Sequence, residues 1–425
     1  MIQQMHNSVQ RARGWVVLAL ALAVAMATPS TAFGSDPQKK NAAPSAPKSE
    51  GVLSDLDKSR IVWPQPPYIA RIKYIDFFAG EKLPDFAAKP AKTKNAWMDR
   101  LAGSAGNKGE DTLKNHFFMG EPHGMAVDSK GNLYVADSKV GAIFIINPET
   151  HDTVMIKNGK DASFGLIMGL AIDDSDRLFV ADSEAHRVLV FGANHKAESA
   201  IREGLASPTG LAIDNENRFL YISDIAADQV LVYDADTLQL LRKIGTGGKT
   251  HTLTTPGDFA KPTGVAVDSD GNLYVVDMLN ARIEIFDADG NFIRTFGKRG
   301  DGPGYFAMPK GVAIDSDGHI WVSDSMQNRL QVYSQEGELL IYMGIAQGLL
   351  PGQFSGLQYI AADTKRHIIF TSEVFPGRVQ EFRYVTQDEA VVEEKRREAE
   401  KKDGKPANKA AAKPAAPSQG VASKP

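Results

Sequence analysis

One short pattern recurs six times along the chain, and this recurrence limits the fold more than any other feature. In five copies a glycine is followed by an apolar residue, then Ala, then Val or Ile, and then Asp. A sixth copy is degenerate. The copies are HGMAVD (123–128), MGLAID (168–173), TGLAID (209–214), TGVAVD (263–268), KGVAID (310–315) and QYIAAD (358–363). The repeats are 41 to 54 residues apart, a length that holds four short strands.

The copy at 261–297 shows what each repeat contains. It has four short runs rich in β-branched and aromatic residues, namely VAVD, LYVVD, RIEIFD and FIRTFG, separated by the turns DSDG and DADG. Asp and Gly are the residues that tight hairpins require. Each repeat is therefore predicted to be a four-stranded antiparallel meander, and six of them bury their faces by forming a ring. The predicted fold class is all-β, a six-bladed β-propeller.

The same motifs resemble those of the NHL-repeat family of six-bladed propellers over residues 68–385. The resemblance is carried by the Pro-x-Gly-[VLM]-Ala-[VI]-Asp start, by second strands such as LYVAD and WVSD, and by Asn/Gln-x-Arg-[IL] before the third strand. It implies a propeller scaffold. Because one fold hosts many activities, function still has to be argued from sites.

The sixth repeat ends near GRVQEFRYV (377–385) without a clear fourth strand. A run that fits the missing strand, RIKYIDFFAG (71–80), stands ahead of the first repeat. We predict that this N-terminal segment pairs with the last blade and hides an open sheet edge. The preceding VWPQPPY (62–68) is interpreted as a stiff lead-in, and NAWMDRLAG (95–103) as a short helix within an insertion at 81–118.

The two ends of the chain have different compositions from the repeats. Arg11 and Arg13 precede the apolar run 14–27 and then small residues, an order typical of a signal peptide, with an apolar core too short for a comfortable membrane span. We therefore expect a signal peptide at 1–34 and an exported, periplasmic or secreted protein. An uncleaved anchor is the alternative. The expected order is then a flexible linker (35–60), the propeller (61–385), and a charged helix with an Ala/Pro/Lys-rich tail (386–425).

Composition excludes several kinds of site. The 425 residues include 48 basic and 52 acidic residues, so no basic excess suggests nucleic-acid binding. The chain contains no cysteine, which excludes disulfides, thiolate metal sites and covalent haem attachment.

The residue before each repeat glycine is the best candidate for a binding site. In a propeller, the loops before the inner strands and those between the second and third strands share one face. The predicted rim of the central channel is His123, Met168, Thr209, Thr263, Lys310 and Gln358. The arginines Arg187, Arg282 and Arg329 add positive charge to the same face, which favours an anionic ligand or an acidic protein patch.

Aspartates recur at two other positions of the repeat. Those that end the second strands are predicted to be structural, paired in three blades with the arginine five residues later; they are Asp137, Asp182, Asp224, Asp277 and Asp324. Ser372 is interpreted as the residue that replaces the Asp in blade six. The turn aspartates in DSKGN, DSDGN and DSDGH lack the spacing of a calcium loop and are predicted to form hairpins.

We expect a non-catalytic binding or assembly scaffold that needs no cofactor and binds a protein partner or an anionic ligand of the cell envelope. The alternative is a metal-dependent enzyme. EPHGMAVD (121–128) is similar to the start of the propeller lyases that cleave peptidyl-α-hydroxyglycine, in which rim histidines hold zinc. Only His123 matches here, although His186 and His251 lie in loops of the same face. A calcium-dependent lactonase is the second enzyme alternative.

Overall fold

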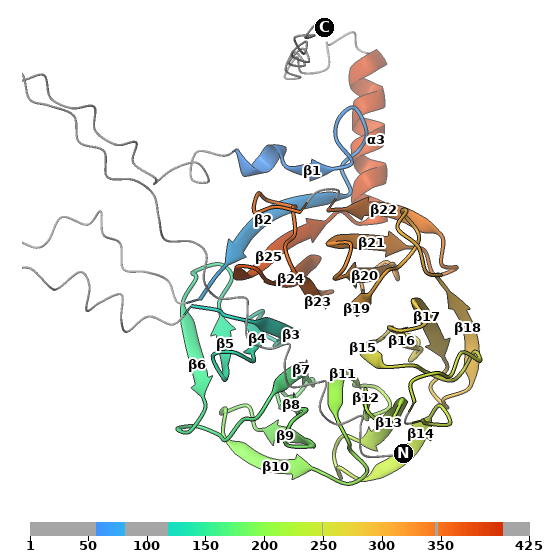
Figure 1. The fold of residues 1–425 in the computed structure, drawn as a ribbon. Helices are drawn as coiled ribbons and strands as arrows, with labels where there is room; N and C mark the ends of the chain where they lie inside the picture. Colours follow the sequence, from blue (N-terminus) through green and yellow to red (C-terminus); the bar gives the residue numbers. More distant parts are fainter. Residues whose placement is uncertain (1–56, 81–117, 249, 345–346, 403–425) are drawn as a thin grey trace, which may run out of the picture. The chain divides into compact units, whose positions relative to one another are not determined.

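The fold is a ring of six antiparallel β-sheets, seen in a computed structural model that describes residues 57–80, 118–248, 250–344 and 347–402. Each sheet is one blade (Figure 1). The innermost strand of each blade contacts the innermost strand of the next, and β23 contacts β3 to complete the ring. The predicted six-bladed β-propeller is confirmed.

Each blade is formed by four strands that are consecutive along the chain, except in the last blade. Blade one contains β3 (Pro122–Val127), β4 (Leu133–Asp137), β5 (Ala142–Ile146) and β6 (Thr153–Lys157). Blade two contains β7 (Ile167–Ile172), β8 (Leu178–Asp182), β9 (Arg187–Phe191) and β10 (Ala197–Ile201). Blade three contains β11 (Pro208–Asp214), β12 (Phe219–Asp224), β13 (Gln229–Asp234) and β14 (Leu240–Ile244).

Blades four and five repeat this order, and blade six draws on both ends of the described chain. Blade four contains β15 (Pro262–Val267), β16 (Leu273–Asp277), β17 (Arg282–Phe286) and β18 (Phe292–Phe296). Blade five contains β19 (Pro309–Ile314), β20 (Ile320–Asp324), β21 (Arg329–Tyr333) and β22 (Leu339–Met343). Blade six contains β23 (Leu357–Asp363), β24 (Ile368–Val374), β25 (Gly377–Tyr384), β2 (Ile72–Phe78) and β1 (Val62–Trp63).

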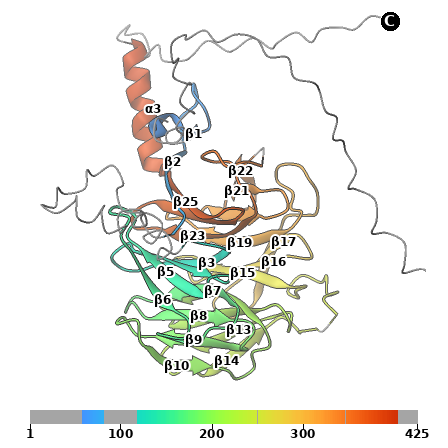
Figure 2. The same ribbon diagram turned by 60° about the vertical axis from the view of Figure 1, so that its left-hand side comes forward.

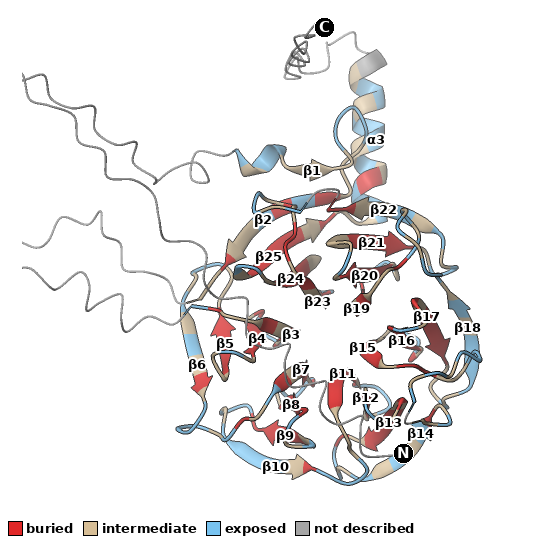
Figure 3. Ribbon diagram, in the orientation of Figure 1, coloured by how far each residue is buried: buried red, intermediate tan, exposed pale blue. Residues whose placement is uncertain are grey.

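Burial decreases from the centre of the ring to its outside (Figure 3). All five residues of β4 are buried, whereas β10 and β18 are mostly exposed. The apolar second strands therefore lie between neighbouring sheets, as continuous apolar runs require. The core is divided among the interfaces between blades, where side chains such as Phe191, Tyr233 and Trp321 are almost fully buried.

The antiparallel register defines two opposite ends of the blades. Pro122 pairs with Asp137, so the start of an inner strand lies beside the end of its second strand. We call this end, with the loops before the inner strands and between the second and third strands, the loop face. The opposite end carries the hairpins after the inner and third strands and is the turn face. Figure 2 views the same ring obliquely.

The ring is closed by the N-terminal strand β2, which pairs with β25 from Ile72 opposite Tyr384 to Phe78 opposite Val379. This confirms the closing strand predicted from RIKYIDFFAG. Ile72, Tyr74 and Phe78 are buried in the closed blade. Val62 and Trp63, predicted to be a lead-in, form the additional strand β1 and pair with Lys73 and Ile72.

Helix α3 (Gln387–Lys402) follows blade six and has more contacts than a solvated tail. Ala390 is buried, and the Arg397 guanidinium donates to the backbone carbonyl of Pro67 at 2.9 Å. Within the helix, Glu393 pairs with Arg397 at 2.8 Å. Among the described residues, no helix is long and apolar enough to cross a membrane. The predicted signal peptide, the linker up to residue 56, helix 95–103 and the tail after 402 lie outside the described residues.

Candidate functional site

The repeat glycines lie where inner strands of neighbouring blades approach closely around the ring axis. A Cβ on Gly264 would lie 2.7 Å from the backbone oxygen of Lys310, and one on Gly311 would lie 2.9 Å from the nitrogen of Ile360. These distances are too short for any side chain, which explains why glycine recurs at this position. The residue before each glycine is thereby held beside its counterpart in the next blade.

His123 and Lys310 are the titratable groups of this predicted rim. Burial and, secondarily, the Lys310 ammonium lower the pKa of His123 to about 4, with Asp137 opposing them. The ring Nδ1 of His123 is buried without a hydrogen-bond partner among the described residues, and the ring lies edge-on to Tyr359. Burial lowers the pKa of Lys310. Because the pKa of His123 is about 4, its imidazole is neutral at pH 7.

The other four rim residues differ in how much they offer to a ligand. Thr209 and Thr263 are buried: Thr209 Oγ1 lies 3.0 Å from Ser223 Oγ, and Thr263 Oγ1 donates to the backbone oxygen of Lys310 at 2.9 Å. Met168 and Gln358 are half-buried, and the Gln358 amide donates to the carbonyl of Gly356. The hydroxyl of Thr263 thus connects blades four and five, and that of Thr209, bonded within blade three, also lies 3.5 Å from the carbonyl of Pro262 in blade four.

Serines near the ends of second strands connect neighbouring blades, a role that was not predicted from the sequence. The hydroxyl of Ser323 donates to the carbonyl of Gln358 at 2.6 Å, and that of Ser372 donates to the carbonyl of His123 at 2.8 Å. Ser223 makes the equivalent bond to Thr263. These bonds fix the backbone of the rim, so the side chains before the glycines are carried on rigid strands.

The second-strand aspartates hold the loops that lead into the inner strands. All five are fully buried. Asp137 accepts from the backbone N–H of Gly120 at 2.6 Å, and Asp324 accepts from that of Ala307 at 2.7 Å. Asp182, Asp224 and Asp277 accept equivalent loop amides. Five blades share this hydrogen-bonded brace, which is the arrangement expected of a structural residue.

The arginines at the start of the third strands point into this network. Arg187 pairs with Asp182 at 3.0 Å and Arg282 with Asp277 at 2.8 Å; their side chains are 15% and 11% exposed. Arg282 also donates to the carbonyls of three loop residues. Arg329 instead contacts Gln327 and the carbonyl of Asp301. These guanidiniums are occupied by loop contacts within the chain.

In blade six the acidic position is filled by Glu373, and the interpretation of Ser372 as its replacement is wrong. Glu373 pairs with Leu357 in the register in which Asp324 pairs with Pro309. Its carboxylate accepts from the amide of Ser355 and from Arg378 at 3.0 Å. A glutamate one position after the serine could have been recognised from Arg378, which follows it by five residues as Arg282 follows Asp277.

His186 and His251, considered as additional metal ligands, form hydrogen bonds with other groups of the chain. His251 Nδ1 lies 2.7 Å from the buried carboxylate of Asp228, and His186 Nδ1 contacts the carbonyl of Ala206. In the described part of the chain, no group of three or more His, Cys, Asp or Glu side chains could hold a metal ion. The residues present therefore do not fit a zinc site built around His123, which needs three such donors.

The turn face is acidic, and its aspartates serve the hairpins. Asp128 accepts from the amides of Lys130 and Asn132, and Asp268 accepts in the same way from Asp270 and Asn272. This is the hairpin chemistry predicted for the DSKGN and DSDGN turns.

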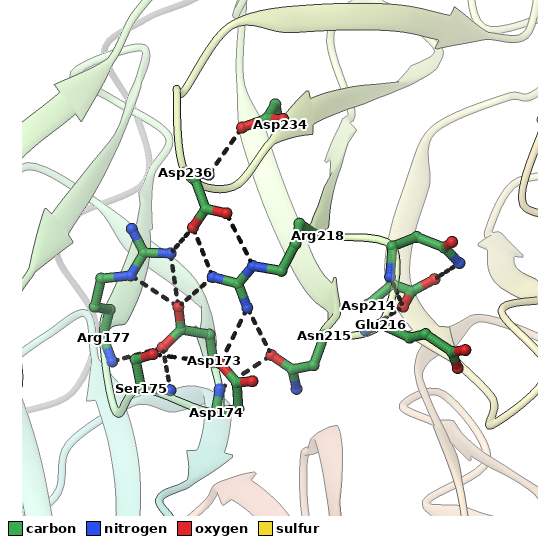
Figure 4. A network of polar contacts seen from close by, with 11 residues as sticks. Asp173, Asp174, Ser175, Arg177, Asp214, Asn215, Glu216, Arg218, Asp234 and Asp236 are labelled. Carbon is green, nitrogen blue, oxygen red and sulfur yellow. Dashed lines mark hydrogen bonds and ion pairs between the residues drawn. The ribbon is translucent and has the colours of Figure 1, made fainter.

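One turn-face aspartate also joins two blades. Asp173 of blade two binds Arg177 at 2.8 Å and Arg218 of blade three at 3.2 Å, and both arginines reach Asp236 (Figure 4). These carboxylates are therefore engaged within the chain.

Three family models match the chain. The model described as a 6-bladed beta-propeller matches residues 261–404. The NHL repeat model matches residues 119–146 and 167–191, and the model of the SMP-30/Gluconolactonase/LRE-like region matches residues 192–299.

Individual relatives are distant or share only part of their length. A probable peptidyl-alpha-hydroxyglycine alpha-amidating lyase of Caenorhabditis elegans is 36% identical over 91 residues, 20% of this chain and 24% of the worm protein. A solved Bacteroides thetaiotaomicron protein of unknown function covers 62% of this chain and 70% of its own length, with 17% identity and a TM-score of 0.51. A gluconolactonase from Xanthomonas campestris covers 63% and 87%, with 18% identity and a TM-score of 0.49. The Bacteroides structure shows a shared fold alone.

Proposed function

Because this chain is an NHL-repeat protein folded as a six-bladed β-propeller, we propose that it is an exported, non-catalytic binding module. Its loop face, around His123 and Lys310, receives an anionic group of a ligand or partner in the cell envelope. The location follows from the signal-peptide pattern at the N-terminus.

The observation that carries this proposal is the unpaired charge of Lys310. Its pKa is lowered by burial, and among the described residues no carboxylate forms an ion pair with its ammonium. The second-strand acids nearest in the repeat bind loop amides instead. A half-buried cation without a counter-charge is unfavourable, and a bound anion supplies that charge. Neutral His123 offers a hydrogen bond beside it.

Calorimetric titration with citrate and with inorganic phosphate tests this proposal. Wild-type protein should bind at least one of these anions, with affinity falling as salt rises. Lys310→Met should weaken binding by about tenfold or more, because a hydrogen-bonded charge pair is lost. Lys243→Met, which removes an exposed cation on β14, is the matched control. No binding by wild type, or equal binding by the Lys310 variant, would overturn the proposal.

A second candidate function is a metal-dependent lyase. It is favoured by the 36% identity to the worm lyase over 91 residues, against the finding that the described residues place no group of three zinc donors around His123. Elemental analysis of the purified full chain separates the two candidates. Zinc in stoichiometric amount, lost in His123→Ala, supports the lyase; a binding module predicts neither result.

A further inference from the structure

Large apolar side chains are exposed along one side of the loop face. They come from loops between second and third strands, from loops before inner strands and from the segment before β3. Their exposed fractions range from 40% to 66%. We call this set the apolar crescent: Leu279, Met326, Leu349, Leu350, Phe375 and Phe118. It runs from blade four through blades five and six to blade one.

The loops that carry the crescent touch one another in sequence from blade four to blade five. Arg299 Nη2 donates to the carbonyl of Leu279 at 2.6 Å, and Gln327 Nε2 donates to the carbonyl of Gly300 at 2.7 Å. Leu279 and Met326 are thus presented by loops joined through the segment 298–308.

The contacts continue from blade five to blade one. The Asn328 side chain accepts from the amide of Gly356 at 2.7 Å, and Arg378 Nη1 donates to the carbonyl of Leu349 at 2.7 Å. A Cβ on Gly377, two residues after Phe375, would collide with the backbone of Met119, next to Phe118. The loops that carry the crescent are therefore joined to one another from blade four to blade one.

The loops beneath the crescent are firmly held. Phe306 and Phe354, which belong to two of these loops, are fully buried between blades. Gln331 accepts from the amide of Gly304 at 2.7 Å, and Gln380 accepts from that of Gly352 at 3.0 Å. Exposed apolar side chains on a held, polar-rimmed surface are typical of protein interaction sites.

Charges beside the crescent determine the chemistry of its partner. Lys298 and Arg299 are exposed on the blade-five loop, and Lys298 Nζ lies 4.9 Å from the centre of the Tyr305 ring. Lys310 adds a further cation at the rim. Asp301 is an exposed acid of the same loop, so the balance of these groups is positive. Complementarity of charge then requires an acidic partner.

We propose that the apolar crescent binds an acidic segment of another protein that carries large apolar side chains. The inference rests on the proposed function, because it names the partner of the same loop face. The apolar side chains of the segment cover Met326, Leu350 and Phe375, and its carboxylates meet Lys298, Arg299 and Lys310. A simple anion would neutralise the charge of Lys310 only. A partner that also covers the apolar crescent must carry apolar side chains as well.

Fluorescence anisotropy with three labelled synthetic peptides tests this inference on the full chain. One peptide combines Glu with Leu and Phe, the second combines Glu with Ser, and the third combines Lys with Leu and Phe. We expect the first to bind at least about tenfold more tightly than the others. Met326→Ser combined with Phe375→Ser should weaken that binding by about tenfold or more.

The matched control is Val154→Ser combined with Leu241→Ser. These side chains are 61% and 46% exposed but lie on the outer strands β6 and β14. This control should bind the Glu/Leu/Phe peptide as wild type does. Equal binding of all three peptides, or full binding by the Met326/Phe375 variant, would overturn the inference. Citrate binding by wild type and by the Met326/Phe375 variant would then show that the proposed anion site is retained although the inference about the crescent has failed.

Two other occupants give distinct results. Sedimentation velocity would reveal a dimer that is lost in the Met326/Phe375 variant if a second copy covers the crescent. Co-sedimentation with vesicles of phosphatidylcholine and phosphatidylglycerol, lost in the same variant and without peptide binding, would show a lipid surface instead. Either result would refute an acidic protein segment.

Discussion

Two residues at one repeat position give the loop face its chemical character. The position before the repeat glycine holds buried, hydrogen-bonded threonines in blades three and four, but His123 and Lys310 in blades one and five. A repeat architecture tolerates such differences because the glycine and the braces around it, rather than this side chain, hold the strand. Specificity in this fold therefore depends on single substitutions in a constant frame.

The ionisation of His123 can be followed directly. Its pKa is lowered to about 4 by burial and by Lys310, so its NMR titration midpoint should lie near pH 4, and Lys310→Met should raise it. Unfolded histidine binds a proton near pH 6.5. The folded chain binds fewer protons between these values, so the His123 contribution to the free energy of unfolding falls as pH drops from about 6.5 to 4. A midpoint of about 6.5 in wild type would show an exposed ring.

Among the elements, the closing strand β2 joins the N-terminal part of the described chain to the last blade. It fills the fourth position of blade six, next to β25, and buries Ile72, Tyr74 and Phe78. The strand is far from β25 in the sequence, yet its apolar pattern alone was sufficient to predict the pairing. The prediction was correct because blade six without β2 has an unpaired strand edge, and such an edge is covered by a strand with a matching apolar pattern.

Removal of the closing strand should destabilise the whole propeller. A chain that starts at residue 84 loses the β2 backbone hydrogen bonds and three buried side chains, a loss on the order of 5 kcal/mol or more. Thermal unfolding followed by circular dichroism, with a chain starting at residue 57 as the control, measures it. Equal melting temperatures would show that blade six is complete without β2.

The pairing of β2 with β25 should also depend on pH through Glu381. Burial and the facing Asp76 raise the pKa of Glu381 to about 7, against the opposing effect of Lys58. The folded chain then binds more protons than the unfolded chain between about pH 4.5 and 7. The free energy of unfolding therefore falls as pH rises through this range.

Glu381→Gln removes this proton dependence. Urea unfolding should show nearly equal stabilities of the two proteins at pH 5 and, at pH 8, an advantage for the variant on the order of 2–3 kcal/mol. Glu394→Gln, on the exposed surface of α3, is the control and should change neither value. A variant that is less stable than wild type at both pH values would show that the ionised carboxylate stabilises the strand pair.

At the scale of the whole molecule, the sequence predicts the architecture well because its signals are local. Repeat spacing, turn aspartates and short apolar runs identified six blades and the closing strand, and the second-strand aspartates were recognised from their recurrence. The repeat motif, the turns and the strand runs each depend on a few neighbouring residues. The number of blades and their strands can therefore be predicted from the sequence without knowledge of long-range contacts.

The loop face was less predictable because its properties depend on register and burial. Glu373 takes the place of an aspartate only once the pairing of β23 and β24 is known. Arg187 and Arg282, expected to give the rim positive charge, turn toward buried acids and loop carbonyls. The exposure of Met326 and Phe375 has no signature in composition, since apolar residues occur in every loop of this face.

The composition of blade six also determines when during synthesis the ring can close. Its strand β2, residues 72–78, precedes all the other blades in the chain, whereas the three inner strands of the same blade, β23 to β25, come last and end at Tyr384. Synthesis runs from the N-terminus, so β2 cannot pair with β25, the last strand of the propeller, until that strand has been made. A product truncated before β25 leaves this edge of β2 unpaired, and unpaired strand edges are templates for association with other chains.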